Sequence, residues 1–168
     1  MMEINISCPN VNAGFLAFGQ DAKNVEKLTA DIKKIAKQPI IMKLTPNVTD
    51  ITEIAKAAEA GGADAISLIN TFALANKTGG VSGPIVKPVA LRMVYQAAHA
   101  VNIPIIGMGG IASAEDAIEF ILAGASAVSV GTANFHNPAV TMEVIDGIEA
   151  YMKKNGFENV ADMVGIVE

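Results

Sequence analysis

Two glycine-containing segments near the end of the chain have the composition of an anion site. Residues 105–108 are mainly apolar and run into Gly109-Gly110, and residues 128–130 run into Gly131-Thr132. Glycines let backbone N–H groups approach an anion closely, and a following helix N-terminus adds a favourable dipole. Ordinary tight turns would also use glycine, but the occurrence of the same pattern in two consecutive segments favours a phosphate site.

Lys43 follows the apolar residues 39–42 and so ends a buried segment with a cation. Burial of an ammonium without an anionic partner is costly. The lysine could lie beside the electron-rich edge of a flavin, form a Schiff base as in aldolases, or extend to the rim of the fold. These three interpretations remain open from the residue alone.

Cys8, the single cysteine, lies between Asn5 and Asn10 at the end of another apolar segment. Most free cysteines are inert apolar residues, but a thiolate in this polar setting could act as a base or nucleophile. Asn70-Thr71 end a further apolar segment, and their amide and hydroxyl groups suit a planar polar substrate. The two histidines, His99 and His136, are interpreted as structural.

The elements that must position these residues alternate regularly along the chain. The predicted strands are short Ile/Val/Leu-rich runs without polar alternation, as expected for strands buried on both faces: Glu3–Ser7, Pro39–Leu44, Ala65–Ile69, Ile103–Met108 and Ala127–Val130. The predicted helices between and after them are Ala22–Lys37, Asp50–Ala60, Pro88–Val101, Ala114–Ala123 and Pro138–Asn155, with a short one near Val160–Val164.

Strand–helix alternation predicts right-handed βαβ units and a parallel sheet. Functional residue types follow all the predicted strands, as in a (β/α)8 TIM barrel, whereas an open doubly wound sheet gathers them near one switch point. We therefore predict an α/β fold in which residues 1–168 form a single domain with the last five units of a TIM barrel, βα4 to βα8.

The composition excludes several classes of function. The 17 acidic residues outnumber the 12 basic ones, which argues against binding to nucleic acid or an anionic membrane. No apolar run has the length of a membrane span or of a signal peptide. One cysteine cannot form an internal disulfide or an all-cysteine metal site. We expect a cytoplasmic protein with no metal site.

In combination, the motifs resemble the class 1 dihydroorotate dehydrogenases. They occur in family order and cover essentially the whole chain: residues 5–10, Lys43-Leu44, residues 69–71, residues 78–84 with Lys87-Pro88, residues 106–110 and residues 131–133. Residues 82–84 and 131–135 are more similar to the NAD-linked class 1B than to the fumarate-linked class 1A.

The resemblance implies FMN-dependent oxidation of dihydroorotate to orotate in pyrimidine biosynthesis. Cys8 would be the general base that removes a proton from C5 while hydride passes from C6 to N5 of FMN. The substrate would be held by Asn5, Asn10, Asn70 and Thr71. The cofactor would be contacted by Asn5, Lys43, Ile69 and Gly83, and its phosphate by Gly109, Gly110, Gly131 and Thr132.

The resemblance also implies partners. We expect a homodimer and, for class 1B, a second subunit that carries FAD and a [2Fe–2S] cluster to pass electrons to NAD+. Two departures from the family pattern are evident: the first three βα units are absent, and the segment between Thr71 and Ala75 is about a dozen residues shorter. Two alternatives are another phosphate-binding barrel enzyme, such as a Lys43 aldolase, and an inactive half-barrel that only self-associates.

Overall fold

The computed structural model describes residues 1–7, 18–73 and 79–167. Its strands are β1 (Met2–Asn5), β2 (Ile40–Lys43), β3 (Ala65–Leu68), β4 (Phe72–Ala73), β5 (Gly80–Val81), β6 (Ile105–Met108) and β7 (Ala127–Ser129). Its α-helices are α2 (Ala22–Ile35), α3 (Ile51–Ala60), α4 (Lys87–Ala98), α5 (Ala114–Leu122), α6 (Ala133–His136) and α7 (Val140–Asn155), and 3-10 helices span Pro84–Val86 and Val160–Met163.

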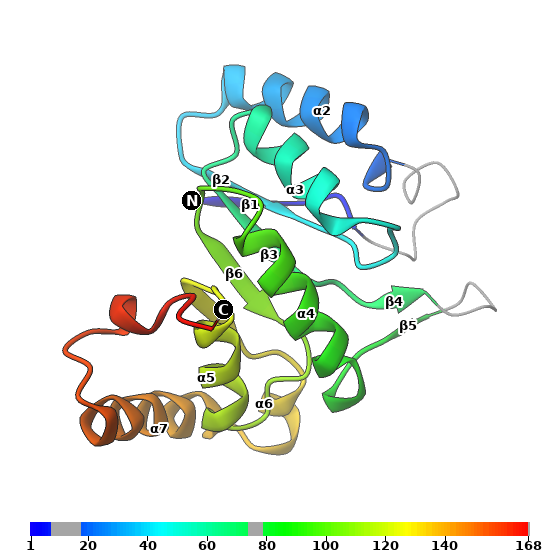
Figure 1. The fold of residues 1–168 in the computed structure, drawn as a ribbon. Coiled ribbons are helices and arrows are strands. Elements are labelled where there is room, and N and C mark those ends of the chain that lie inside the picture. Colours follow the sequence, from blue (N-terminus) through cyan, green and yellow to red (C-terminus); the bar gives the residue numbers. More distant parts are fainter. Residues whose placement is uncertain (8–17, 74–78, 168) are drawn as a thin grey trace.

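Five strands form one parallel sheet in the order β1-β2-β3-β6-β7. Within this sheet each strand pairs with the sheet strand that precedes it in the chain, so the strand order never changes direction. A doubly wound sheet would contain a reversal at its switch point, whereas a barrel adds strands in one direction. The sheet therefore has the winding of a partial TIM barrel, as predicted (Figure 1).

Three of the α-helices, α2, α3 and α5, begin at a side-chain cap. Asp21 accepts a hydrogen bond from the backbone N–H of Asn24, and Asp50 accepts one from that of Thr52. Ser113 and Asp116 form a reciprocal capping box at the start of α5. Such caps satisfy N–H groups that have no partner within the helix, which fixes where each helix begins.

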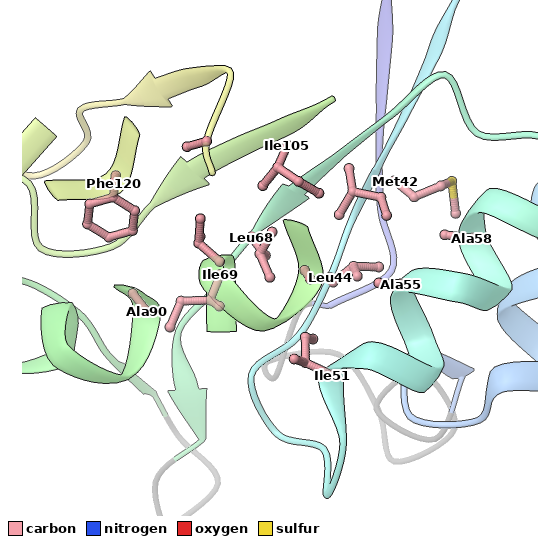
Figure 2. Close-up of a cluster of buried hydrophobic side chains, with 14 of the residues drawn as sticks. Met42, Leu44, Ile51, Ala55, Ala58, Leu68, Ile69, Ala90, Ile105 and Phe120 are labelled. Atoms are coloured by element: carbon pink, nitrogen blue, oxygen red, sulfur yellow. The ribbon is translucent and has the colours of Figure 1, made fainter. Parts of the chain in front are cut away.

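The core lies between the outer face of the sheet and the helices that cover it. Met42, Leu68 and Ile105 are almost completely buried, and they share one apolar cluster with residues of α3, α4 and α5. Figure 2 shows Ala55 and Ala58 of α3 facing the strand side chains of this cluster. Burial of each large side chain contributes roughly 1.5–3 kcal/mol, so this layer holds the strands in position.

The other face of the sheet carries polar side chains. Asn5 is opposite Lys43, and Lys43 is opposite Ser67, in the strand register. Because side chains alternate between the faces of a strand, these three residues lie on one face, away from the apolar cluster. In a barrel this is the inner face.

The bounds of most elements differ from the predicted ones by one to three residues. β1 ends at Asn5 rather than at residue 7, since Ser7 instead bonds back to Asn5. α4 begins at Lys87, one residue before the predicted Pro88, and ends at Ala98 rather than at Val101. The antiparallel pair β4–β5 and the helix α6 were not predicted. Two residues in each of these strands and a single turn in α6 are too little to show a hydrophobic period.

No helix in the described part of the chain is both long enough and apolar enough to cross a membrane.

Candidate functional site

The predicted site residues lie along the edge of the sheet where the parallel strands end. Asn5 and Lys43 are the last residues of β1 and β2, and Gly109 follows β6 directly. Asn70 comes just after β3, and Gly131 just after β7. A parallel sheet brings these carboxyl ends to the same rim, which is where TIM-barrel enzymes bind their ligands.

A cavity of about 280 Å³ at this rim collects most of the predicted residues. It is lined by Lys43, Ile69, Thr71, Ser82, Gly83, Met108, Gly109, Gly110, Ile111, Ser129, Gly131 and Thr132. Asn5 and Asn70 are not among the described residues that line it. Cys8 and Asn10 lie outside the described residues.

A second cavity, of about 380 Å³, continues from the first. The two share Ser82, Gly83, Gly110, Ile111 and Thr132, and the second extends to Ala112, Ala133, His136, Asn137 and Val140. Their volumes together fall in the range of small-molecule and cofactor sites. The shared residues lie between a cavity lined by Lys43 and one lined by residues of α6 and α7.

Asn5 and Asn70 meet in a network of side-chain hydrogen bonds beside the first cavity. Asn5 Oδ1 accepts from the hydroxyl of Ser7 at 2.7 Å and from its backbone N–H at 3.0 Å. Asn70 Nδ2 donates to Ser7 Oγ at 2.8 Å, and a longer contact of 3.4 Å reaches Asn5 Oδ1. Asn70 Oδ1 accepts from the Thr71 backbone N–H at 2.8 Å. Both amides are therefore oriented by the protein itself.

Ser7 and Asn47 are parts of this rim that sequence reasoning missed. Asn47 Nδ2 donates to the backbone carbonyl of Thr71 at 3.1 Å, and its Oδ1 accepts from the Ala73 backbone N–H at 3.0 Å. Asn47 thus ties the loop after β2 to the start of β4. The only sequence signal was its position, since residues 44–48 directly follow a strand that ends in a predicted site residue.

Lys43 has an anionic partner that the sequence did not suggest. Its Nζ lies 3.6 Å from Glu3 Oε1, and the other oxygen, Glu3 Oε2, accepts from Ser67 Oγ at 2.8 Å. Ser67 is completely buried. The pairing offsets the cost of placing an ammonium inside the fold. Glu3 is two residues before Asn5, so strand alternation could have placed both on the inner face.

The glycine segments differ in what their backbones require. Gly109 and Gly110 have φ angles of +119° and +82°, a region that favours glycine. A Cβ on Gly110 would lie 2.8 Å from the carbonyl oxygen of Gly83. Gly83 also has a positive φ, +85°, but at Gly83 and Gly131 a Cβ would meet no atom within 4 Å. The first pair therefore makes a tight turn, while the latter two leave open space at the cavity.

These features fit a flavin nucleotide in chemistry and arrangement. The open space at Gly83 and Gly131 admits a ligand next to the backbone. The hydroxyls of Ser82 and Thr132 line both cavities and can donate to a phosphate. The Lys43 ammonium stands at the first cavity, where a polar ring edge would have a cationic neighbour.

Comparison with known proteins identifies the family of the chain. The family model for dihydroorotate dehydrogenase matches residues 1–152. The chain is 62% identical to the catalytic subunit of dihydroorotate dehydrogenase B (NAD(+)) from Lachnoclostridium phytofermentans over its whole length, covering 60% of that relative. It is 60% identical to the same subunit from Alkaliphilus oremlandii, with 98% of this chain and 59% of that relative covered.

A solved structure gives the same result for the fold. The crystal structure of DHODH from Eimeria tenella, in complex with ferulenol, superimposes with a TM-score of 0.85 at 26% identity, over 98% of this chain and 53% of that one. The chain spans about 60% of the length of the curated relatives it matches. Sequence and fold together show that the chain belongs to the dihydroorotate dehydrogenase family, and its relatives are of the NAD-linked class.

Proposed function

We propose that the protein containing this chain oxidises dihydroorotate to orotate with FMN as the bound cofactor. The observation that carries the proposal is the cavity at the strand ends, whose lining includes Lys43, Thr71 and the glycines of both phosphate-type segments. Family membership supports the same reaction.

The protein's own groups have distinct tasks in this proposal. Glycine backbone and Thr132 hold the phosphate end, and Lys43 stands near the ring system. Asn5, Asn70 and Thr71 orient the planar substrate from the amide network, with Asn10 as a further contact. Ile69 and Gly83 contribute backbone along the cofactor.

Cys8 is the proposed general base. Oxidation of dihydroorotate forms the C5–C6 double bond as a proton leaves C5 and a hydride leaves C6. The thiolate of Cys8 takes the proton and becomes a thiol. When bound, the flavin supplies the hydride acceptor.

The proposal extends to partners and location. Because the relatives are named as catalytic subunits of an NAD(+) enzyme, we infer that electrons leave through a second subunit that carries FAD and a [2Fe–2S] cluster. We also infer a homodimer and a cytoplasmic location. Co-purification of a flavin- and iron-containing chain would test the first inference.

Replacement of Cys8 tests the reaction. In the flavin-loaded protein, Cys8→Ser should slow reduction of the flavin by dihydroorotate by about 100-fold at neutral pH, because a hydroxyl ionises far less readily than a thiol and so supplies much less of the basic form. Orotate affinity should change little. Stopped-flow absorbance measures the first quantity, and titration of the flavin spectrum with orotate measures the second.

Two results would contradict the proposal. A colourless protein that releases no FMN on denaturation would remove the cofactor assignment. Equal reduction rates for Cys8→Ser and the unmodified protein across the pH range would remove Cys8 as the base while leaving flavin binding in place.

A further inference from the structure

The start of α4 packs directly behind the glycine turn that follows β6. A Cβ on Gly110 would lie 2.9 Å from the Cβ of Lys87 and 3.1 Å from its backbone nitrogen. Gly110 lines both cavities, whereas Lys87 is not among the described residues that line either. Lys87 therefore lies behind the turn rather than within the proposed ligand space.

Lys87 is joined to two carboxylates of α5. Its Nζ lies 2.5 Å from Asp116 Oδ1 and 2.8 Å from Glu119 Oε2. The other oxygen, Asp116 Oδ2, accepts from the backbone N–H groups of Ala112 at 2.9 Å and Ser113 at 3.1 Å. One ion pair thus connects the first residue of α4 to the end of the loop 109–113.

The Lys87–Asp116 pair is well shielded, whereas the side chain of Glu119 is 47% exposed. The side chains of Lys87 and Asp116 are 22% and 18% exposed. Hydrogen bonds to Asp116 and then Glu119 raise the pKa of Lys87. Burial by itself would raise the pKa of Asp116, but hydrogen bonds from Lys87 and Ala112 lower it overall. Lys87 and Asp116 are therefore both charged at neutral pH.

The charges of this cluster would act on an anion bound on the cavity side of the glycine turn. A phosphate on the cavity side of Gly109 and Gly110 would meet the field of Asp116 and Glu119 through the loop. Lys87 reduces that local charge from −2 to −1. Removal of the ammonium would leave the largely shielded Asp116 and the half-exposed Glu119 uncompensated near an anion. Repulsion from the shielded carboxylate is stronger than it would be in bulk water.

We propose that Lys87 is a positioning residue for the phosphate end of the flavin, which holds the loop 109–113 against α4 and offsets the carboxylates behind it. The inference rests on the proposed flavin-binding function. It assigns Lys87 no direct contact with the ligand, so its effect should depend on the phosphate and on Asp116 rather than on the flavin ring.

The test compares FMN with riboflavin, which lacks the phosphate. In the full-length protein that carries this chain, freed of flavin, Lys87→Gln should weaken FMN binding by about tenfold. Riboflavin binding should stay within about twofold. Quenching of flavin fluorescence measures both dissociation constants.

A second variant restores the charge balance. Lys87→Gln combined with Asp116→Asn returns the cluster to a charge of −1, and the amide oxygen of the introduced asparagine can still accept from the loop N–H groups. This double variant should recover most of the FMN affinity. Lys27→Gln is the matched control, since it removes a lysine from the exposed pair with Asp31 on α2 and should change neither affinity.

The outcomes separate the possible roles. Equal weakening of FMN and riboflavin by Lys87→Gln would show a purely structural role and overturn the inference. Failure of the double variant to recover FMN binding would show that the charge balance behind the turn does not govern phosphate binding, and it would also overturn the inference. Absence of flavin binding by the unmodified protein would instead overturn the proposed function itself, and the inference with it.

Discussion

The two sides of the rim are built by opposite means. At the ends of β6 and β7, the site consists mainly of backbone exposed by glycines, such as Gly110 and Gly131. At the ends of β1 and β3, it consists of side-chain amides held in a hydrogen-bond network that includes Asn5 and Asn70. We call these the phosphate side and the amide side.

This difference indicates which kind of substitution should disrupt each side. Backbone N–H groups are the same in every residue except proline, so the phosphate side depends on conformation and on the space that glycine leaves. The amide side depends on which atoms donate and which accept, because a misplaced acceptor leaves a buried group without its partner. A substitution that adds bulk or changes the backbone conformation should therefore weaken binding at the phosphate side. A substitution that exchanges a single donor or acceptor atom should weaken binding at the amide side.

The largest effect is expected from a single methyl group on the phosphate side. Gly110→Ala places a Cβ at a φ of +82° and within 3 Å of the Gly83 carbonyl oxygen and the Lys87 side chain. Strain of this kind costs about 1–3 kcal/mol, and the backbone shift that relieves it should abolish tight FMN binding. Thermal unfolding and flavin fluorescence measure the two effects.

Gly131→Ala is the matched comparison. Its Cβ would meet no atom within 4 Å and its φ is not in the left-handed region, so the melting temperature should be unchanged. An equally large fall in melting temperature for Gly131→Ala and Gly110→Ala would show that local space and φ do not decide which glycine tolerates a side chain.

A smaller effect, confined to the substrate, is expected on the amide side. Asn70→Asp keeps the acceptor for the Thr71 backbone N–H but replaces the donor to Ser7 Oγ with an oxygen. Loss of that hydrogen bond and the new like-charge contact with an anionic substrate should weaken orotate binding by about 10- to 100-fold. FMN affinity should remain the same.

Titration of the flavin spectrum with orotate gives the substrate affinity. Asn155→Asp, at an exposed residue whose amide donates to the Tyr151 carbonyl, is the control. Parallel losses of FMN and orotate binding in Asn70→Asp would show that the two sides are not independent.

The smallest effect concerns the pH dependence of stability. The pKa of Asp116 lies below its ordinary value of 3.8 in the folded protein, so the unfolded chain takes up its proton first. The stabilisation is thus present above that ordinary value and is lost as the pH falls through the lowered pKa. We expect Asp116→Asn to lower the free energy of unfolding by about 1 kcal/mol at pH 7.

As the pH falls below the lowered pKa of Asp116, the two proteins should converge, because the carboxyl is then protonated in the folded state as well. Urea unfolding at a series of pH values measures this. Asp31→Asn, which removes the exposed pairs with Lys27 and Lys34 on α2, should show less pH dependence. A constant difference between Asp116→Asn and the parent at all pH values would contradict a role for the charge.

The sequence predicted the architecture well because its signals are local. Apolar runs such as Ile40–Met42 act through neighbours in the chain and appear in the structure where expected. The cap at Asp21 and the Ser113–Asp116 box, which begin two of the helices, are local in the same way. The same holds for the residues at the strand ends, since parallel strands bring their carboxyl ends together. The two-residue strands β4 and β5 and the single turn of α6 were not predicted because they show no period.

The sequence alone therefore determined the five strands of the main sheet and the longer helices. It also determined the winding implied by their alternation and the rim on which Lys43, Thr71 and the glycines gather. Only the tertiary structure decided which side chains meet across that rim. Glu3 pairs with Lys43, Asn70 with Ser7, and Lys87 with Asp116, and each pair is separated by many residues in the chain. Such contacts depend on strand register and on the packing of helices against the sheet, which no local pattern encodes.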